Sequence, residues 1–266
     1  MRQPSFHDVG SIFPGETKIC SVESQTTVRE AISIMLENKY SQLPVIDGDE
    51  ILGIFSLRTL AHQLMHCNST SVKDFLTETP VSEVVDHQFP KITVKESLDN
   101  IIEQLENHEA ILVNSPHGPQ AIATSSDVLR YFVRVAKPFV LIQEIELALR
   151  NMVDICAPKN QLNECINRSI AKKYESQNRN PPETLSDMTF EEIRMIIVCS
   201  ANWSLFEAHL GKNKDLVGTK LEIIRKIRNN VFHFKNDITW HDLENLISVR
   251  NWLLGKLRRL QPIKPP

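Results

Sequence analysis

Residues 42–55 read QLPVIDGDEILGIF, two apolar runs separated by an Asp-Gly turn. This pattern predicts two antiparallel strands joined by a hairpin. Upstream, residues 27–38 carry apolar side chains at helical spacing behind a threonine that can cap a helix, and residues 18–22 predict a short strand before it. Downstream, residues 56–65 predict a second helix. The order around the hairpin is therefore β-α-β-β-α.

The same order recurs later in the chain. Residues 91–94 predict a strand and residues 98–106 a helix. Residues 110–124, AILVNSPHGPQAIAT, then predict a strand, a turn and a strand, and residues 126–135 predict another helix. Two copies of one order, offset by about 70 residues, indicate an internal repeat that packs as one unit.

The second half of the chain predicts helices almost throughout. Amphipathic or helix-favouring runs occupy residues 140–153, 160–175, 189–210, 216–232 and 240–260. Such a series favours a helical bundle. The predicted fold class is therefore α+β, with a repeat-built domain over residues 13–137, divided into 13–75 and 76–137, and an all-α domain over residues 138–261, and with the boundary at Lys137-Pro138.

Charge separates the two halves. Residues 1–137 hold 11 Lys and Arg against 18 Asp and Glu, a net charge of −7, whereas residues 138–266 hold 19 against 15, a net charge of +4. A basic half suits a polyanionic partner better than an acidic half does. The five cysteines are scattered and form no C-x-x-C pair, and the sequence predicts neither a membrane span nor a signal segment. We therefore expect a cytoplasmic protein with reduced thiols and no membrane partner.

The strand-to-helix junctions of the repeats are GIFSLRTL at residues 53–60 and QAIATSSDVL at residues 120–129. Together with the doubled β-α-β-β-α order, they resemble the CBS family, whose repeats carry G-h-h-[ST]-x-x-D at this point. An Asp on the first helical turn can accept the hydroxyls of a ribose, and a Ser or Thr beside free helix amides can hold a phosphate. The second repeat keeps this pair as Thr124 and Asp127, whereas the first repeat has Thr59 in place of the Asp.

The resemblance thus implies one adenosine nucleotide (ATP, ADP or AMP) as a regulatory ligand. Its expected contacts are Thr124, Ser126, Asp127, Cys20, Ser41 and His108. The alternative is that Asp127 only caps its helix and that the repeats form a packing scaffold.

Residues 227–237 read IRNNVFHFKND, in which Arg228 and His233 enclose four residues. With EIELALR at residues 144–150 and the helical run after Thr239, this segment resembles the R-x4-H motif of HEPN domains. The resemblance implies a metal-independent endoribonuclease that leaves 2′,3′-cyclic phosphate ends. In it His233 would exchange protons, Arg228 would hold the phosphate and Asn229 would orient either group.

The spacing within the motif bears on assembly. Five residues on one straight helix place Arg228 and His233 about 140° apart, so convergence needs a helix irregularity or a second chain. HEPN relatives form their site between two copies, and the resemblance therefore implies a homodimer. The other interpretation is structural: Arg228 pairs with Glu146, His233 caps a helix end, and the domain only dimerises or binds a partner.

The primary hypothesis is a nucleotide-regulated endoribonuclease with a stress or phage-defence role, and with RNA as its substrate. The rival is a non-catalytic nucleotide sensor or adaptor. No sequence-specific DNA recognition is expected. His62 and His66 have a spacing of four that suits a metal on a helix, but no third ligand is evident, so we expect no metal site.

Overall fold

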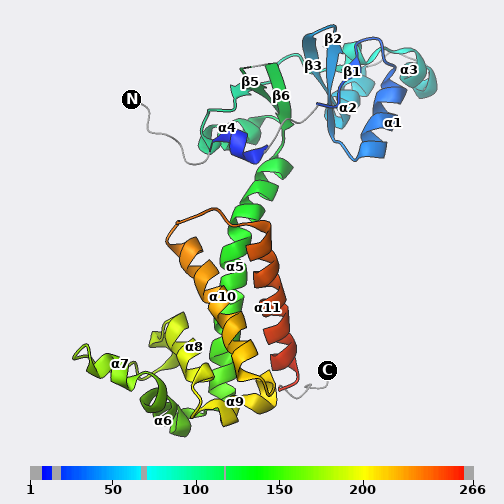
Figure 1. Ribbon diagram of the computed structural model, residues 1–266. Helices are drawn as coiled ribbons and strands as arrows, with labels where there is room; N and C mark the ends of the chain where they lie inside the picture. Colours follow the sequence, from blue (N-terminus) through cyan, green and yellow to red (C-terminus); the bar gives the residue numbers. More distant parts are fainter. Residues whose placement is uncertain (1–7, 14–18, 67–70, 117, 261–266) are drawn as a thin grey trace, which may run out of the picture. The chain divides into compact units, whose positions relative to one another are not determined.

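The structure is a computed structural model that describes residues 8–13, 19–66, 71–116 and 118–260. The chain divides into two compact units, Met1–Val133 and Arg134–Pro266 (Figure 1). The first unit is α+β and the second is helical, as the sequence predicted.

The N-terminal unit contains two three-stranded sheets of identical topology. In each, a parallel pair is followed by an antiparallel hairpin. The first repeat comprises β1 (Val22–Glu23), α1 (Val28–Asn38), β2 (Gln42–Asp47), β3 (Glu50–Ser56) and α2 (Leu57–His66). The second comprises β4 (Lys91–Thr93), α4 (Leu98–Asn107), β5 (Ile111–Ser115), β6 (Gly118–Ala123) and the start of α5 (Ser125–Cys156). The predicted order is confirmed in both repeats.

Local signals explain where these elements begin. Thr27 forms a capping box with Glu30: Glu30 N donates to Thr27 Oγ1 at 3.3 Å, and Thr27 N donates to Glu30 Oε2 at 3.0 Å. This reciprocal pair satisfies donors that the first turn of α1 leaves open. In the hairpin, Gly48 has φ +59°, a conformation that glycine adopts without steric cost.

Each repeat is completed by a segment that precedes the other repeat. The 3₁₀ turn Val9–Ile12 buries Val9 and Ile12 in the core of the second repeat, against Ile92 and Ile101. Backbone bonds fix it there, since Val9 N donates to Glu96 O and Gly10 N to Val94 O, both at 2.9 Å. The predicted first domain, which began at residue 13, therefore omits a segment that the second core needs.

The connection between the repeats plays the same part for the first repeat. It contains α3 (Val72–Glu78) and the 3₁₀ turn Val81–Val84, which the sequence did not predict. Val81 and Val84 are buried in the core of the first repeat, and Val81 N donates to Thr26 O at 2.7 Å. Farther along, Ile54 and Asp86 exchange two backbone hydrogen bonds, which covers the free edge of β3.

The separate helices predicted over residues 126–135 and 140–153 are one helix, because α5 runs without interruption from Ser125 to Cys156 with Pro138 inside it. The division between the two units falls within this helix, after Val133. Proline normally interrupts a helix since it lacks an N–H and crowds the preceding turn. Here the apolar face that follows is buried in the helical core, including Ile142, Ile145 and Leu149, and this packing favours continuation.

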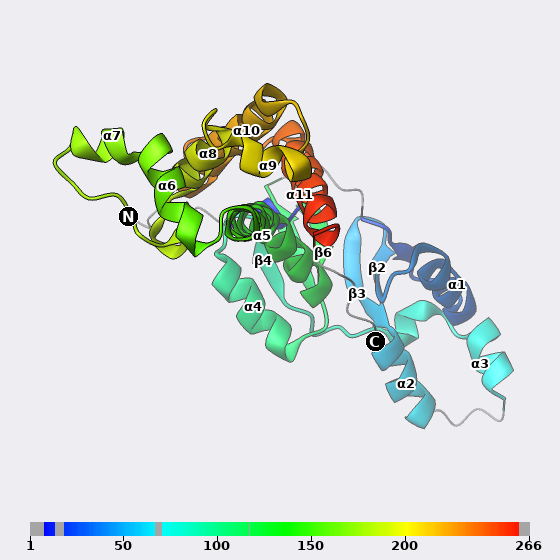
Figure 2. The same cartoon turned by 90° about the horizontal axis from the view of Figure 1, so that it is seen from below.

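The helical unit packs around α5. It adds α6 (Lys159–Ser169), α7 (Ala171–Glu175), α8 (Phe190–Val198), α9 (Trp203–Leu210), α10 (Lys214–Phe232) and α11 (Trp240–Arg258). In Figure 2, which looks along α5, helices α8, α10 and α11 lie beside it. The inward faces of these helices and of α9 form one apolar core that includes Ile193, Phe206, Leu221 and Leu253. No described helix is long and apolar enough to cross a membrane.

Two of the predicted helices are each divided in two. The run 160–175 breaks at Ile170, and the run 189–210 breaks between α8 and α9. The second break has a clear cause: Asn202 is fully buried, and its Nδ2 donates to Cys165 O at 3.1 Å and to Ile196 O at 3.2 Å. An amide side chain that binds backbone carbonyls competes with helical hydrogen bonds. Periodicity alone does not reveal such a tertiary contact.

We expect Gly53→Ala to destabilise the N-terminal unit. A Cβ at this buried position would lie 2.7 Å from Val85 Cγ2 and 2.8 Å from Asp86 O, so the edge-covering segment would have to move. Overpacking of this kind costs about 1–3 kcal/mol. The three tryptophans, Trp203, Trp240 and Trp252, all lie in the helical unit, so their fluorescence reports that unit alone.

Thermal unfolding followed by circular dichroism should therefore show an earlier transition in Gly53→Ala, while the tryptophan transition stays in place. Gly255→Ala is the matched control, since nothing lies within 4 Å of its added Cβ. An alanine there should leave the N-terminal transition unchanged and stabilise α11 by up to about 1 kcal/mol. Unaltered melting of Gly53→Ala would contradict the close approach of the two segments.

Candidate functional site

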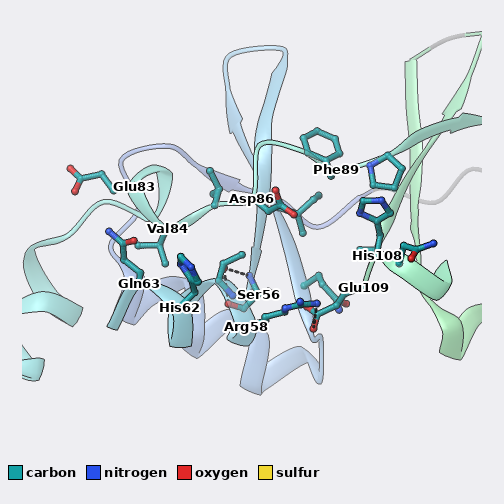
Figure 3. A pocket seen from close by; sticks show the side chains of 17 residues that line it. Ser56, Arg58, His62, Gln63, Glu83, Val84, Asp86, Phe89, His108 and Glu109 are labelled. Atoms are coloured by element: carbon teal, nitrogen blue, oxygen red, sulfur yellow. Dashed lines mark hydrogen bonds and ion pairs between the residues drawn. The ribbon is translucent and has the colours of Figure 1, made fainter. Parts of the chain in front are cut away.

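A cavity of about 370 Å³ lies in the N-terminal unit, between the end of β3, α2 and the second repeat (Figure 3). The first repeat contributes Ser56, Arg58 and His62, and the second contributes His108 and Glu109. The wall between them comes from the connecting segment, through residues that include Glu83, Asp86 and Phe89. The volume lies within the range of small-molecule sites.

The charged groups around this cavity are mainly acidic. Arg58 Nη1 lies 3.9 Å from Glu109 Oε1, so the one guanidinium of the lining is partly neutralised by a carboxylate of the other repeat. Glu83 and Asp86 add two more carboxylates. A phosphate group in this cavity would face three carboxylates and a single guanidinium.

The junction of the first repeat uses its hydroxyl groups internally. Ser56 N donates to Thr59 Oγ1 at 2.9 Å, and Thr59 Oγ1 donates to Ser56 O at 2.9 Å. Thr59 N in turn donates to Ser56 Oγ at 3.1 Å. The hydroxyl proton of Thr59 is therefore committed to its own turn.

The junction of the second repeat has the same turn but a different side chain. Thr124 N donates to Asp127 Oδ2 at 3.0 Å, and Thr124 Oγ1 donates to the same oxygen at 2.7 Å. The other oxygen, Oδ1, lies 3.6 Å from Nη1 of Arg130, and the Asp127 side chain is 24% exposed. Because Arg130 is 80% exposed, this ion pair is weak and leaves Oδ1 able to accept from a ligand.

The other predicted nucleotide contacts are distributed differently. Ser126 is exposed on the first turn of α5, next to Asp127. Cys20 is half-buried and packs on the core of the first repeat, and Ser41 is exposed beside Gln42. His108 lines the cavity of Ser56 and Thr59, whose lining residues do not include Thr124, Ser126 or Asp127. Lys18, two residues before Cys20, lies outside the described residues.

The sequence did not single out Asp86 or Phe89 as lining residues. They belong to the connecting segment, and only the folded chain brings that segment to the junction of the first repeat. The pairing of Ile54 with Asp86 is a non-local contact, and no periodic pattern signals it.

The predicted motif of the helical unit lies at the end of α10. Arg228 Nε donates to Glu146 Oε1 at 3.3 Å, and the side chains of this pair are 30% and 21% exposed. The Arg228 guanidinium also lies 4.8 Å from the ring centre of Phe232, a cation–π contact. Glu146 also faces Arg150, whose Nη2 is 4.0 Å from Oε2. The predicted tie between the first helix of this domain and the motif helix is therefore present.

His233 is the C-terminal cap of α10, with φ −104° and ψ 4°. Its backbone N–H donates to Asn229 O at 3.2 Å, and its side chain is exposed. Within the described part of one chain, Arg228 and His233 share no hydrogen bond. Asn229 lines a small cavity of about 190 Å³ together with Arg228 and Arg225. One chain thus places the three predicted residues on one helix end without joining them into a site.

An ion-pair network borders this cavity and links α8 to α10. Arg194 makes two hydrogen bonds to Glu191, at 2.7 and 2.8 Å, and Arg225 makes two to Glu222, at 2.6 and 2.8 Å. Cross-pairs at 3.6 and 3.7 Å close the ring. The hydrogen bonds from Arg225 hold the pKa of Glu222 below its usual range. This network joins α8 to α10, the helix that carries Arg228 and Asn229.

No group of three or more His, Cys, Asp or Glu side chains among the described residues is arranged to hold a metal ion. Cys20, Cys156, Cys165 and Cys199 are free thiols, and Cys67 lies outside the described residues. Burial raises the pKa of Cys156 to about 11, so this thiol stays protonated at neutral pH.

Comparison with known proteins bears on the N-terminal unit. The CBS domain family model matches residues 9–66, from the 3₁₀ turn that completes the second repeat to the end of α2. This chain contains a CBS domain. The second repeat of the CBS unit has the same sheet topology, although the matched range ends before it.

Individual relatives also match this half of the chain. The UPF0053 protein YhdT of Bacillus subtilis is 28% identical over 125 residues, which is 44% of this chain and 25% of that protein. The chain thus spans about a quarter of the length of this relative.

Solved CBS structures match as well. A CBS domain-containing protein of unknown function from Bacillus anthracis is 18% identical, with a TM-score of 0.42 over 49% of this chain and 96% of that one. CBSX2, in a structure in complex with AMP, is 19% identical, with a TM-score of 0.39 over 48% of this chain and 98% of that one.

Outside the CBS unit, one buried carboxylate connects α7 and α8 of the helical unit. Glu192 is only 3% exposed, and it accepts hydrogen bonds from the Tyr174 hydroxyl and from Thr189 N, the latter at 2.8 Å. Burial alone would raise the pKa of Glu192, but the hydrogen bonds from Tyr174 and Thr189 together hold the pKa below its usual range. The folded unit therefore stabilises the ionised form of Glu192.

Because the folded pKa is depressed, this stabilisation is complete above the unfolded Glu value of about 4.3 and is lost as the pH falls through the folded pKa. We expect Glu192→Gln to lower the unfolding free energy of the helical unit at pH 7 and to flatten its decline in acid. Urea unfolding followed by tryptophan fluorescence measures both. Glu244→Gln, at an exposed position on α11, is the control and should behave as wild type. Equal acid profiles for wild type and Glu192→Gln would refute this assignment.

Proposed function

We propose that this protein is a nucleotide-responsive regulator whose CBS unit binds one adenosine nucleotide (ATP, ADP or AMP) at the junction of the second repeat. Asp127 is the observation that carries the proposal. Its Oδ2 is fixed by Thr124, so the carboxylate is held in place, while Oδ1 remains open to a ligand hydroxyl. A positioned charged acceptor of this kind forms strong hydrogen bonds with a ribose.

The phosphate end of the ligand has suitable donors nearby. Ser126 carries an exposed hydroxyl group, whereas the Thr124 hydroxyl already donates to Asp127 Oδ2. The first turn of α5 also begins with backbone N–H groups that have no acceptor within the helix. A helix N-terminus also favours negative charge. Ribose and phosphate recognition therefore converge on one turn of the chain.

The junction of the first repeat does not offer the same chemistry. Thr59 is uncharged and already donates its hydroxyl proton to Ser56 O. The adjoining cavity is bordered by Glu83, Asp86 and Glu109, which repel phosphate. We therefore assign the adenosine site to Asp127 and not to Thr59.

Metal-independent RNA cleavage by a pair of helical units is a second candidate function. The observation that favours it is the exposed His233, which stands at a helix end one turn from Arg228 and Asn229. Histidine is the usual general acid or base in such chemistry, and an arginine can stabilise a developing phosphorane charge. Since one chain does not join these groups, two copies of α10 would have to meet, which makes the protein a homodimer.

If Arg228 stays paired with Glu146 and never binds a phosphate, the helical unit does not cleave RNA. Arg228 would then be a structural tie, and the helical unit would act as a dimerising or partner-binding adaptor. Both outcomes keep the CBS unit as the sensor, and they differ only in what the helical unit does.

Asp127→Ala should weaken nucleotide binding by roughly 5- to 150-fold, because the ribose hydroxyls lose their acceptor at a cost of about 1–3 kcal/mol. Asp127→Asn separates this effect from the cap, since an amide oxygen can still accept from Thr124 N. It should fold as wild type and still bind poorly. Isothermal titration with ATP, ADP and AMP measures the affinities. Thr59→Ala is the matched control at the other junction and should bind as wild type. If it weakens binding as much as Asp127→Ala does, the one-site assignment fails.

His233→Ala should remove RNA cleavage in the presence of a chelator while leaving the fold and the oligomeric state unchanged. General acid–base catalysis contributes roughly 10²–10⁴-fold, so the loss should be evident on a gel. The products of the wild type should end in 2′,3′-cyclic phosphates. His241→Ala, another exposed histidine nearby, is the control and should cleave normally. Cleavage that persists in His233→Ala would mean that the motif is not the catalytic site, and no cleavage by the wild type would favour the adaptor.

A further inference from the structure

The connection between α10 and α11 holds an aromatic residue in an unusual backbone conformation. Phe234 has φ +50°, and it follows His233 directly. Phe234 N donates to Val231 O at 3.3 Å, and Lys235 N donates to Asn230 O at 3.1 Å. This pair of bonds is the Schellman helix ending, in which glycine usually occupies the left-handed position. A phenylalanine here bears a steric cost that a glycine would avoid.

The side chain is also exposed rather than packed. Phe234 is 83% exposed and Trp240 is 73% exposed, the highest values for aromatic residues in the part of the chain that the structure describes. Trp240 is the first residue of α11, whose start is fixed by a capping box between Thr239 and Asp242. Two rings are thus presented to solvent from rigid helix ends. The backbone of Phe234 is strained and its ring is exposed, so core packing does not explain why a phenylalanine occupies this position.

The groups around the two rings suit a polyanion with flat bases. His233 and Lys235 are exposed, and Arg228 is 30% exposed on the preceding turn. Asn229 and Asn230 add amide groups that can bind base edges, and Asp237 is the acidic residue of the loop. Exposed aromatic rings beside basic side chains are the usual surface for unpaired nucleic acid, whose bases stack on the rings.

We propose that Phe234 and Trp240 are stacking positions for unpaired RNA bases that flank a phosphate placed at His233. The proposal rests on the second candidate function above, and it names what that site recognises. The left-handed backbone at Phe234 ends α10 directly after His233, so the ring and the imidazole belong to consecutive residues at the helix end. The ring next to the histidine would then determine which position along a single strand is presented to it.

The experiment measures RNA binding separately from cleavage. Full-length His233→Ala serves as the background, so that bound RNA stays intact, and fluorescence anisotropy follows a labelled single-stranded oligoribonucleotide. Adding Phe234→Gly should weaken binding about tenfold, because stacking on one ring is lost. Glycine suits the left-handed position, so this variant keeps the helix ending and should fold at least as well. Phe234→Trp should restore the affinity.

Matched controls separate stacking from charge and from general apolar exposure. Leu216→Ala removes an exposed apolar side chain at the opposite end of α10 and should bind as the background does. Lys235→Ala should weaken binding in a way that shrinks as salt is raised, whereas the loss in Phe234→Gly should persist, because only the first effect releases counterions.

Equal affinity of Phe234→Gly and the background would overturn the proposal, as would the absence of RNA binding in all variants. A loss of binding together with a loss of the dimer in light scattering would also overturn it, since the rings would then contact a second copy. If Phe234-dependent binding holds but wild type never cleaves RNA, the stacking site stands and only the ribonuclease function fails.

Discussion

The N-terminal unit depends on the burial of two short apolar segments, each carried by the stretch of chain that precedes the other repeat. Val9–Ile12 completes the core of the second repeat, and Val81–Val84 completes that of the first. Each segment is held by backbone hydrogen bonds to the strand region that it covers. Neither three-stranded sheet therefore closes its own core, and the two repeats fold as one body. A small sheet with one apolar face needs such a cover to be stable.

The two repeats have the same sheet topology, but their strand-to-helix junctions carry different side chains. At both junctions the residue three positions after the Ser or Thr closes the turn, as Thr59 does in the first repeat and Asp127 in the second. The threonine uses its only proton within the turn, whereas the aspartate keeps one carboxylate oxygen for a ligand. The residue at this one position of the turn thus distinguishes the structural turn at Thr59 from the candidate binding site at Asp127.

The sequence predicts the elements well where the pattern is local. The repeated β-α-β-β-α order and the cap at Thr27 follow from spacing and residue type, and the structure confirms them. The sequence fails to predict where a helix continues or ends when contacts with distant residues determine it. The helix continues through Pro138 because the face that follows, with Ile142 and Ile145, is buried, and the helical run breaks near Asn202 because its amide binds Cys165 O.

The candidate sites follow the same division. Asp127 and Thr124 are neighbours in sequence, so their contact is predictable, whereas the cavity that His108 shares with Asp86 depends on the connecting segment. The Arg228–Glu146 pair joins residues far apart in the chain, and the sequence offered it only as one of two interpretations.

In the helical unit, His233 is exposed at the end of α10, and Arg228 is paired with Glu146. The proposed sensor role depends on one junction of the CBS unit, that of Asp127. The most direct test of the account is therefore the stoichiometry of AMP binding to the wild-type protein by isothermal titration. We expect one site per chain, because, of the two described junctions, only that of Asp127 offers a carboxylate oxygen that can accept from a ligand. Two equivalent sites per chain, or no binding of any adenosine nucleotide, would contradict it.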